Sequence, residues 1–240
     1  MLEHLTLRDF SGIDRDLPFP ELPQLKAVHF YHRRERYRGD TRWGDPDWWE
    51  SRVPCCITKS LLEKLPSLRT LAHHGDCGRC LPDVFEPVQD VLQALAWVDG
   101  EPYYYDHKTP DINCLRRLRH IKIGFYESYF WDGTRPRSLC DGKALPRMES
   151  LETVEVIARR RQPSGEGIII PFRRMVETFS SSKNAGGFKS LRVVDLRSFG
   201  LWNFSTAKWK AMKDEFLDTE IREYRELGIN LLLPEAAGCS

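Results

Sequence analysis

The chain contains no apolar run that approaches the roughly 20 residues needed to span a bilayer as a helix. Its N-terminus carries charged residues where a secretory signal would need an apolar stretch. Its Lys and Arg residues number 36 against 35 Asp and Glu, so the formal net charge of +1 gives no long-range attraction to nucleic acid or to an anionic membrane. We therefore expect an intracellular protein, cytoplasmic or nuclear, with no membrane partner and no preference for nucleic acid.

Signatures of catalysis and of a disulfide framework are also missing. There is no Gly-x-Ser-x-Gly elbow, no phosphate-binding glycine loop ending in Lys-Ser or Lys-Thr, and no His-Glu-x-x-His or Gly-x-Gly-x-x-Gly motif. The 7 cysteines, an odd number without a secretory signal, fit reduced thiols better than paired ones. We expect a protein that acts by binding, with no enzymatic activity and no cofactor.

What the chain does contain is a recurring apolar pattern, Φ-x-x-Φ-x-x-Φ-x-Φ, whose four apolar positions we call the first to fourth anchors. The complete copies are Leu22-Leu25-Val28-Phe30, Leu65-Leu68-Leu71-His73, Leu115-Leu118-Ile121-Ile123, Met148-Leu151-Val154-Val156 and Phe188-Leu191-Val194-Leu196. A histidine takes the fourth position of the second copy. At the start of the chain, Leu2, Leu5 and Leu7 supply the last three anchors only, so the chain is expected to begin inside a repeat. Repetition of one unit predicts stacking into a solenoid.

Segments between the copies have helical patterns. Thr58 is suited to cap a short helix that leads into the strand around Leu68. Asp83 is suited to cap a second helix, in which apolar residues recur at helical spacing, namely Val84, Val88, Val91, Leu92 and Leu95. Further helices are expected to open at Pro171 and Ser205, the latter ending at Gly228 before a closing strand over residues 229–233.

Within each copy, the third and fourth anchors are two residues apart and so point to the same side of a strand. Helices alternating with strands, joined by connections long enough for crossovers, predict a parallel sheet with helices packed behind it. The expected fold is therefore α/β: an irregular leucine-rich-repeat-like solenoid, with parallel strands on one face and helices and long insertions behind. We expect a single domain over residues 1–240, with an incomplete first repeat and insertions near 31–56 and 99–112.

Residues that alternate with the anchors point away from the core and form what we call the open face. They are Thr6, Arg8, Ala27, His29, Tyr31, Thr70, Ala72, His74, His120, Lys122, Thr153, Glu155, Val193, Asp195 and Arg197. Any one of these is more often a solvated strand position than a contact. As a set they are the expected binding surface, with His29, Tyr31, His74, Lys122, Glu155, Asp195 and Arg197 as its candidate residues.

The segment from Tyr31 to Trp49 adds Trp43, Trp48 and Trp49 to this candidate surface, among several arginines. Tryptophan, tyrosine and arginine are enriched in protein interfaces, and a long loop on a solenoid is a suitable place for such anchors. The same tryptophans could instead cover the first repeats as a cap. A single-stranded nucleic acid would also suit arginines among aromatic rings, but the near-zero net charge disfavours it.

A cysteine cluster offers a further alternative. Cys77 and Cys80 are separated by two residues, a spacing at which two thiolates can share a zinc ion, and Cys55 and Cys56 could complete four ligands. Adjacent cysteines make an awkward pair, because neighbouring side chains diverge in an extended strand. Free thiols are therefore favoured, with a zinc-stabilised protein- or nucleic-acid-binding module as the alternative.

The start of each complete copy reads Leu-Pro-Gln-Leu-Lys, Leu-Pro-Ser-Leu-Arg, Leu-Arg-Arg-Leu-Arg, Met-Glu-Ser-Leu-Glu or Phe-Lys-Ser-Leu-Arg. These repeats resemble the C-terminal region of filamentous-fungal F-box proteins, and the likeness covers most of the chain. The resemblance implies a protein-recognition module, the substrate-receptor part of an F-box-type ubiquitin ligase adaptor. The F-box itself is not present, since no paired amphipathic helices precede Leu22. A repeat fragment without independent function is the remaining alternative.

Overall fold

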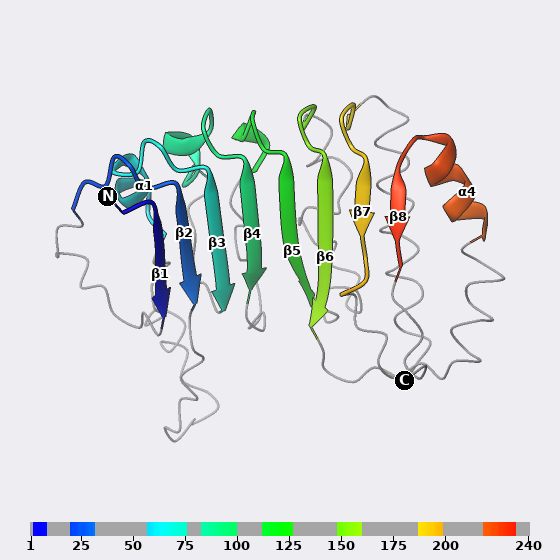
Figure 1. Ribbon diagram of the computed structural model, residues 1–240, viewed down its shortest axis with the longest axis horizontal. Coiled ribbons are helices and arrows are strands. Elements are labelled where there is room, and N and C mark those ends of the chain that lie inside the picture. Colours follow the sequence, from blue (N-terminus) through cyan, green and yellow to red (C-terminus); the bar gives the residue numbers. More distant parts are fainter. Residues whose placement is uncertain are drawn as a thin grey trace, which may run out of the picture. The chain divides into compact units, whose positions relative to one another are not determined.

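The computed structural model describes residues 2–8, 20–31, 57–75, 83–99, 112–126, 148–159, 187–198 and 218–233. Its strands are β1 (His4–Arg8), β2 (Ala27–Tyr31), β3 (Thr70–Gly75), β4 (Ala94–Asp99), β5 (His120–Tyr126), β6 (Thr153–Arg159), β7 (Val193–Asp195) and β8 (Asn230–Leu232). They form one 8-stranded, all-parallel sheet in which strand order follows chain order (Figure 1). This is the arrangement of a leucine-rich-repeat-like solenoid, and it confirms the predicted fold class.

The described helices are α1 (Lys59–Glu63), the 3-10 turns η2 (Glu86–Val88) and η3 (Ile112–Cys114), and α4 (Asp218–Glu226). The predicted cap of α1 is confirmed, because the Thr58 hydroxyl accepts a hydrogen bond from the Leu61 amide at 3.1 Å. The helix starts expected at Pro171 and Ser205 lie outside the described residues. Within the described ranges, neither helix has the length and hydropathy that a membrane crossing requires.

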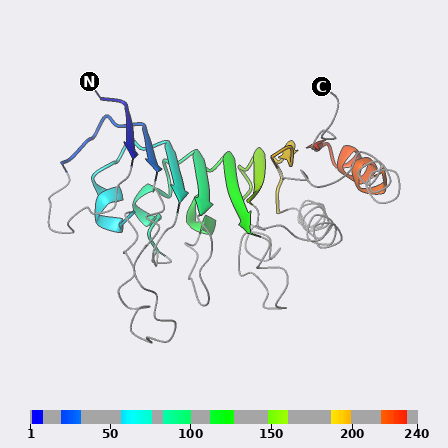
Figure 2. The ribbon, with the colours of Figure 1, turned by 90° about the horizontal axis from the view of Figure 1, so that it is seen from below.

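The chain divides into two compact units. The N-terminal unit comprises Met1–Leu92 and Val98–Leu115, and the C-terminal unit comprises Gln93–Trp97 and Arg116–Ser240. In the N-terminal unit, α1 and η2 lie on one side of strands β1 to β3, and no described helix covers their other side (Figure 2). The single domain expected from the sequence stays a prediction, and the two expected insertions fall almost entirely outside the described residues.

Between its first and second anchors, the repeated pattern encodes a tight turn. The Leu25 amide donates to the Leu22 carbonyl at 3.0 Å, and the Leu68 amide donates to the Leu65 carbonyl at 3.1 Å. The residue after the first anchor in these copies is Pro23 or Pro66, and proline favours the second position of a turn because its ring fixes φ. In the C-terminal unit, the same bond joins Leu151 to Met148 at 3.1 Å and Leu191 to Phe188 at 3.2 Å.

Strand register aligns the anchors of neighbouring copies. Leu5 is paired with Val28 and Leu7 with Phe30, as the partial first copy predicts. Phe30 is in turn paired with His73, which is fully buried and so occupies an anchor position as the pattern expects. Burying a leucine, valine or phenylalanine side chain contributes about 1.5–3 kcal/mol, so the aligned anchors form the main core of each unit.

The helix expected from Asp83 to Leu95 was wrong. The structure has η2 there, followed by strand β4, in which Leu95 is paired with Ile121 and Trp97 with Ile123. Leu92, Leu95 and Trp97 are therefore the second to fourth anchors of a further repeat, and all three are buried. Its first anchor position holds the polar Gln89, which hid the copy. Anchors three residues apart next to a 3-10 turn mimic helical spacing, and this caused the error.

The burial of individual residues in this segment distinguishes a repeat strand from the amphipathic helix that the sequence also allows. Leu92 is fully buried, whereas its neighbour Val91 is only half-buried; an amphipathic helix would have used both on its apolar stripe. We expect Leu92→Ala to lower the free energy of unfolding by about 2–5 kcal/mol, and Val91→Ala to lower it by less than about 1 kcal/mol. Urea denaturation of the two variants measures this difference. Equal losses would contradict the placement of Leu92 as an anchor.

A Schellman motif ends α4. The Ile229 amide donates to the Tyr224 carbonyl at 2.8 Å, and the Gly228 amide donates to the Arg225 carbonyl at 3.0 Å. Gly228 has a φ of 71°, in the left-handed region that only glycine enters without a steric penalty. Ile229 and Tyr224 are both buried, which supplies the apolar contact that accompanies this motif. The helix end and closing strand predicted around Gly228 are confirmed.

A Cβ atom at position 228 would meet nothing within 4 Å, so a substitution there is opposed by backbone conformation and not by packing. We expect Gly228→Ala to lower the free energy of unfolding by about 1–2 kcal/mol. Gly228→Asn should cost less, because asparagine tolerates the left-handed region. Thermal unfolding of the two variants checks the ranking, and an alanine variant as stable as the parent would exclude the left-handed conformation.

Candidate open-face binding surface

The candidate residues of the open face fall into two groups. His29, Tyr31 and His74 lie in the N-terminal unit, and Lys122, Glu155, Asp195 and Arg197 lie in the C-terminal unit. The remaining candidates lie outside the described residues: Trp43, Trp48, Trp49, and the cysteines Cys55, Cys56, Cys77 and Cys80. Among the residues that the structure does describe, no group of three or more His, Cys, Asp or Glu could hold a metal ion.

Sheet register gathers the first group at the carboxyl ends of β1, β2 and β3. Arg8 is paired with Tyr31, and Tyr31 with His74, so the three side chains form one row across the strands. The rings of Tyr31 and His74 are stacked, with centroids 4.7 Å apart and an interplanar angle of 5°. The Arg8 guanidinium carbon lies 5.7 Å from the Tyr31 ring centroid, within the range of a cation–π contact. The His29 ring lies 6.4 Å from that of Tyr31. We call these four residues the aromatic–basic cluster.

The cluster varies in exposure, and so do its neighbours on the open face. Tyr31 is 36% exposed and Arg8 is exposed, while His29 and His74 are half-buried. His4 and Thr6 on β1 are exposed beside the cluster. Ala27 and Ala72 were expected on this surface, but both are buried; Ala27 lies between the longer side chains of His4 and Thr70. The cluster therefore supplies the arginine and the tyrosine of the described open face of these three strands.

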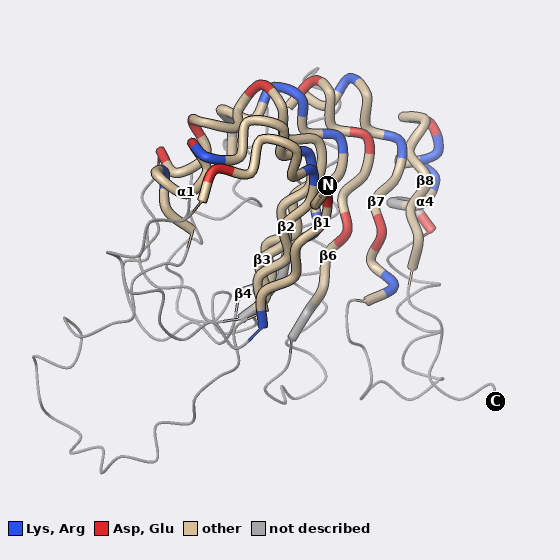
Figure 3. The backbone as a smooth tube through the Cα atoms, turned by 60° about the vertical axis from the view of Figure 1, so that its left-hand side comes forward, with Lys and Arg blue, Asp and Glu red and all other residues tan. Residues whose placement is uncertain are grey.

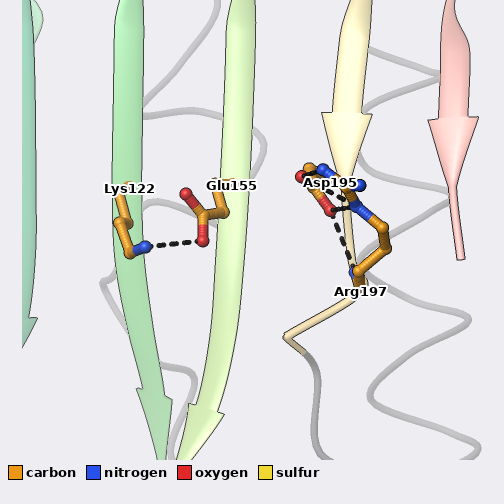
Figure 4. Close-up of polar contacts among 4 residues, drawn as sticks. All are labelled: Lys122, Glu155, Asp195 and Arg197. Carbon is orange, nitrogen blue, oxygen red and sulfur yellow. Dashed lines mark hydrogen bonds and ion pairs between the residues drawn. The ribbon is translucent and has the colours of Figure 1, made fainter. Parts of the chain in front are cut away.

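The second group consists of two ion pairs on the strands of the C-terminal unit (Figure 4). Lys122 on β5 donates to Glu155 on β6 with an Nζ–Oε1 distance of 2.6 Å. Arg197 donates to Asp195 through its backbone amide and Nε, each 3.0 Å from Oδ1, and through Nη2, which is 2.7 Å from Oδ2. We call these four residues the charged cluster.

Hydrogen bonds from Arg197 hold the pKa of the Asp195 carboxyl below its ordinary value. Partial burial opposes this effect by raising the pKa, and the positive charge of Lys122 adds a further decrease. Each carboxylate of the charged cluster therefore has its cation within the cluster. Because its charges are already paired, the cluster is better suited to hold the strands in place than to bind a ligand.

The residue after the second anchor lies between the turn and the strand, and it is charged in most copies (Figure 3). Lys26 pairs with Glu3 at 2.7 Å, and Arg119 with Glu152 at 3.6 Å. These pairs are largely exposed, so each adds little to stability. Pairing along the turns thus accounts for the Leu25-Lys26 and Leu118-Arg119 steps of the repeats.

No family model matches the chain, and neither a curated protein nor a solved structure gives a significant match. The function is therefore argued from the fold and the open face.

Protonation of Asp195 supplies a test of the charged cluster. Arg197→Gln removes the largest cause of the lowered pKa, so the Asp195 pKa should rise toward its ordinary value; Lys122→Gln should raise it less. The stability from this lowered pKa is present above the ordinary carboxyl pKa and is lost as pH falls through the folded value. Carboxyl NMR titration of both variants measures the shifts. A larger rise in Lys122→Gln would contradict the described pairing.

Proposed function

We propose that the protein is a protein-recognition module that binds its partner on the open face of the sheet. The observation that carries this proposal is the aromatic–basic cluster, in which strand register brings arginine, tyrosine and histidine side chains into one row on the open face. Tyrosine and arginine are the residue types that contribute most to protein interfaces. Solenoids built from stacked repeats use an extended sheet face as a binding surface in the same way.

We further propose that this recognition serves a ubiquitin ligase, with the chain as the substrate-receptor part of an F-box-type adaptor. The support for this step is the resemblance of the Leu-Pro-x-Leu and related repeats to the C-terminal region of fungal F-box proteins. In such an adaptor the repeats hold the substrate by binding alone, and transfer of ubiquitin is carried out by other subunits. The chain itself performs no covalent step in this proposal.

Site-specific photo-crosslinking tests where the partner binds. A photoreactive amino acid at Tyr31 should capture the same protein repeatedly from cells of the source organism, because Tyr31 is exposed on the open face. The matched control carries the photoreactive residue at Glu63, which is exposed on α1, on the helical side of the same unit. Mass spectrometry identifies the captured proteins.

A partner captured at Tyr31 and not at Glu63 would support binding on the open face. Equal capture at both positions would contradict it. For the ligase, the captured partner should accumulate in ubiquitinated form when the proteasome is inhibited, and its level should be unaffected by the inhibitor in cells that lack this gene. A partner whose ubiquitination does not depend on the gene would refute the adaptor role while leaving the recognition module intact.

A further inference from the structure

We propose that the aromatic–basic cluster binds an acidic segment of the partner protein, a short stretch of chain that carries Asp or Glu side chains. This inference rests on the proposed recognition function and specifies the chemistry of what is recognised. It begins from the charges on the open face of β1, β2 and β3.

The described open face of these strands carries basic side chains but no acidic ones. Its residues are His4, Thr6, Arg8, Ala27, His29, Tyr31, Thr70, Ala72 and His74, with no aspartate or glutamate among them. On the turn side of the same unit, by contrast, Lys26 is neutralised by Glu3 at 2.7 Å. The described open face thus carries a positive charge at Arg8 and no acidic side chain to balance it. A carboxylate-bearing partner is the one that complements it.

Contacts within the cluster exclude the opposite kind of ligand. Strand β2 lies between β1 and β3, so Arg8 and His74 approach the Tyr31 ring from its two sides. The ring faces that could have held a lysine or methylated amine from a partner are therefore already in contact with this chain. What the cluster offers outward is hydrogen-bond donors, above all the guanidinium of Arg8, which has no acceptor atoms and binds a carboxylate through two parallel bonds.

The cation–π contact with Tyr31 also prepares Arg8 to bind a carboxylate. A guanidinium held over an aromatic ring has already lost much of its side-chain freedom, so less entropy is lost when a carboxylate binds. The row crosses three strands about 4.8 Å apart, or roughly 10 Å in all, which is about three residues of an extended peptide. A short acidic segment therefore fits the row, whereas a long polyanion would find a chain whose net charge is only +1.

Selection from a peptide library tests the proposal and does not require the partner to be identified first. The probe is a library of random 12-residue peptides displayed on phage and selected against the immobilised full chain at pH 6.5. We expect Asp and Glu to be enriched among the retained peptides and Lys and Arg to be depleted. A retained set with no acidic enrichment, or one that is basic, would overturn the proposal.

Binding of a synthetic copy of the most enriched peptide is then compared among variants by fluorescence anisotropy. Arg8→Gln should weaken binding by at least tenfold, since a hydrogen bond to a charged group contributes about 1.5–3 kcal/mol. Arg8→Lys should recover part of the loss, because it keeps the charge without the planar fork. The matched control, Lys122→Gln, removes a positive charge from the open face of the other unit and should change the affinity less than about twofold. Equal losses in Arg8→Gln and Lys122→Gln would contradict the site.

Further outcomes distinguish an acidic segment from a nucleic acid, and failure of the site from failure of the proposed function. A 12-nucleotide single-stranded DNA that binds more tightly than the peptide, and loses affinity in Arg8→Gln, would replace the acidic segment with a nucleic acid. A partner captured by photo-crosslinking at Lys122 and not at Tyr31 would leave the recognition module in place and refute the acidic-segment site. Acidic peptides bound through Arg8, without any partner captured in cells, would support the site and refute the proposed function.

Discussion

Within each unit, a repeat is joined to the next through a carbonyl group just after the second anchor, and the alignment of the strands depends on this bond. In the N-terminal unit the Glu3 carbonyl accepts the amides of Lys26 and Ala27, at 2.8 and 3.1 Å. In the C-terminal unit the carbonyls of Gln93, Arg119 and Glu152 each accept two consecutive amides from the following repeat. A carbonyl oxygen has two lone pairs, so one acceptor can fix both the end of a turn and the start of a strand.

Because this bond sets the register, it also decides which side chains meet. The turn between the first and second anchors places the start of each strand beside the accepting carbonyl of the previous repeat. The third and fourth anchors then lie opposite those of the neighbouring copy. A shift by one residue would turn every anchor outward, so the buried anchors and the backbone bonds favour the same register. The alignment of the side chains on the open face is therefore set by the alignment of the buried anchors. Arg8, Tyr31 and His74 lie in one row because the anchors beside them do.

Much of this arrangement could be predicted from spacing alone, and the limits of that prediction are physical. The pattern located the turns, six of the eight strands and the buried position of His73, because burial requires an anchor at a fixed place, and the glycine after the last helix indicated β8. It missed β4 because a polar residue, Gln89, occupies the first anchor position of that repeat. The first anchor can therefore be polar when the other three are buried. The stacking of Tyr31 on His74 could not be foreseen, because it joins residues 43 positions apart through a register that only the sheet defines. The tryptophans and cysteines named from the sequence lie outside the described residues and stay predictions.

The two clusters of the open face differ in how their charges are balanced. Lys122, Glu155, Asp195 and Arg197 form pairs among themselves, and the lowered pKa of Asp195 keeps that carboxylate ionised and bound to Arg197. Such pairing holds strands and leaves little for a ligand. The aromatic–basic cluster has no carboxylate among its members, and its arginine is in cation–π contact with Tyr31 instead. This difference is the physical basis for proposing that recognition takes place on the N-terminal unit and that the charged cluster braces the strands.

The central claim is that a repeat with a polar residue at its first anchor position, such as Gln89, still forms a strand of the parallel sheet. Inter-strand nuclear Overhauser effects between backbone protons of Leu95, Ile121, Val154 and Val194 test it most directly. The account predicts cross-peaks that connect Leu95 to Ile121, Ile121 to Val154, and Val154 to Val194. Cross-peaks from Leu92 to Leu95 of the kind found in helices, with none from Leu95 to Ile121, would contradict it.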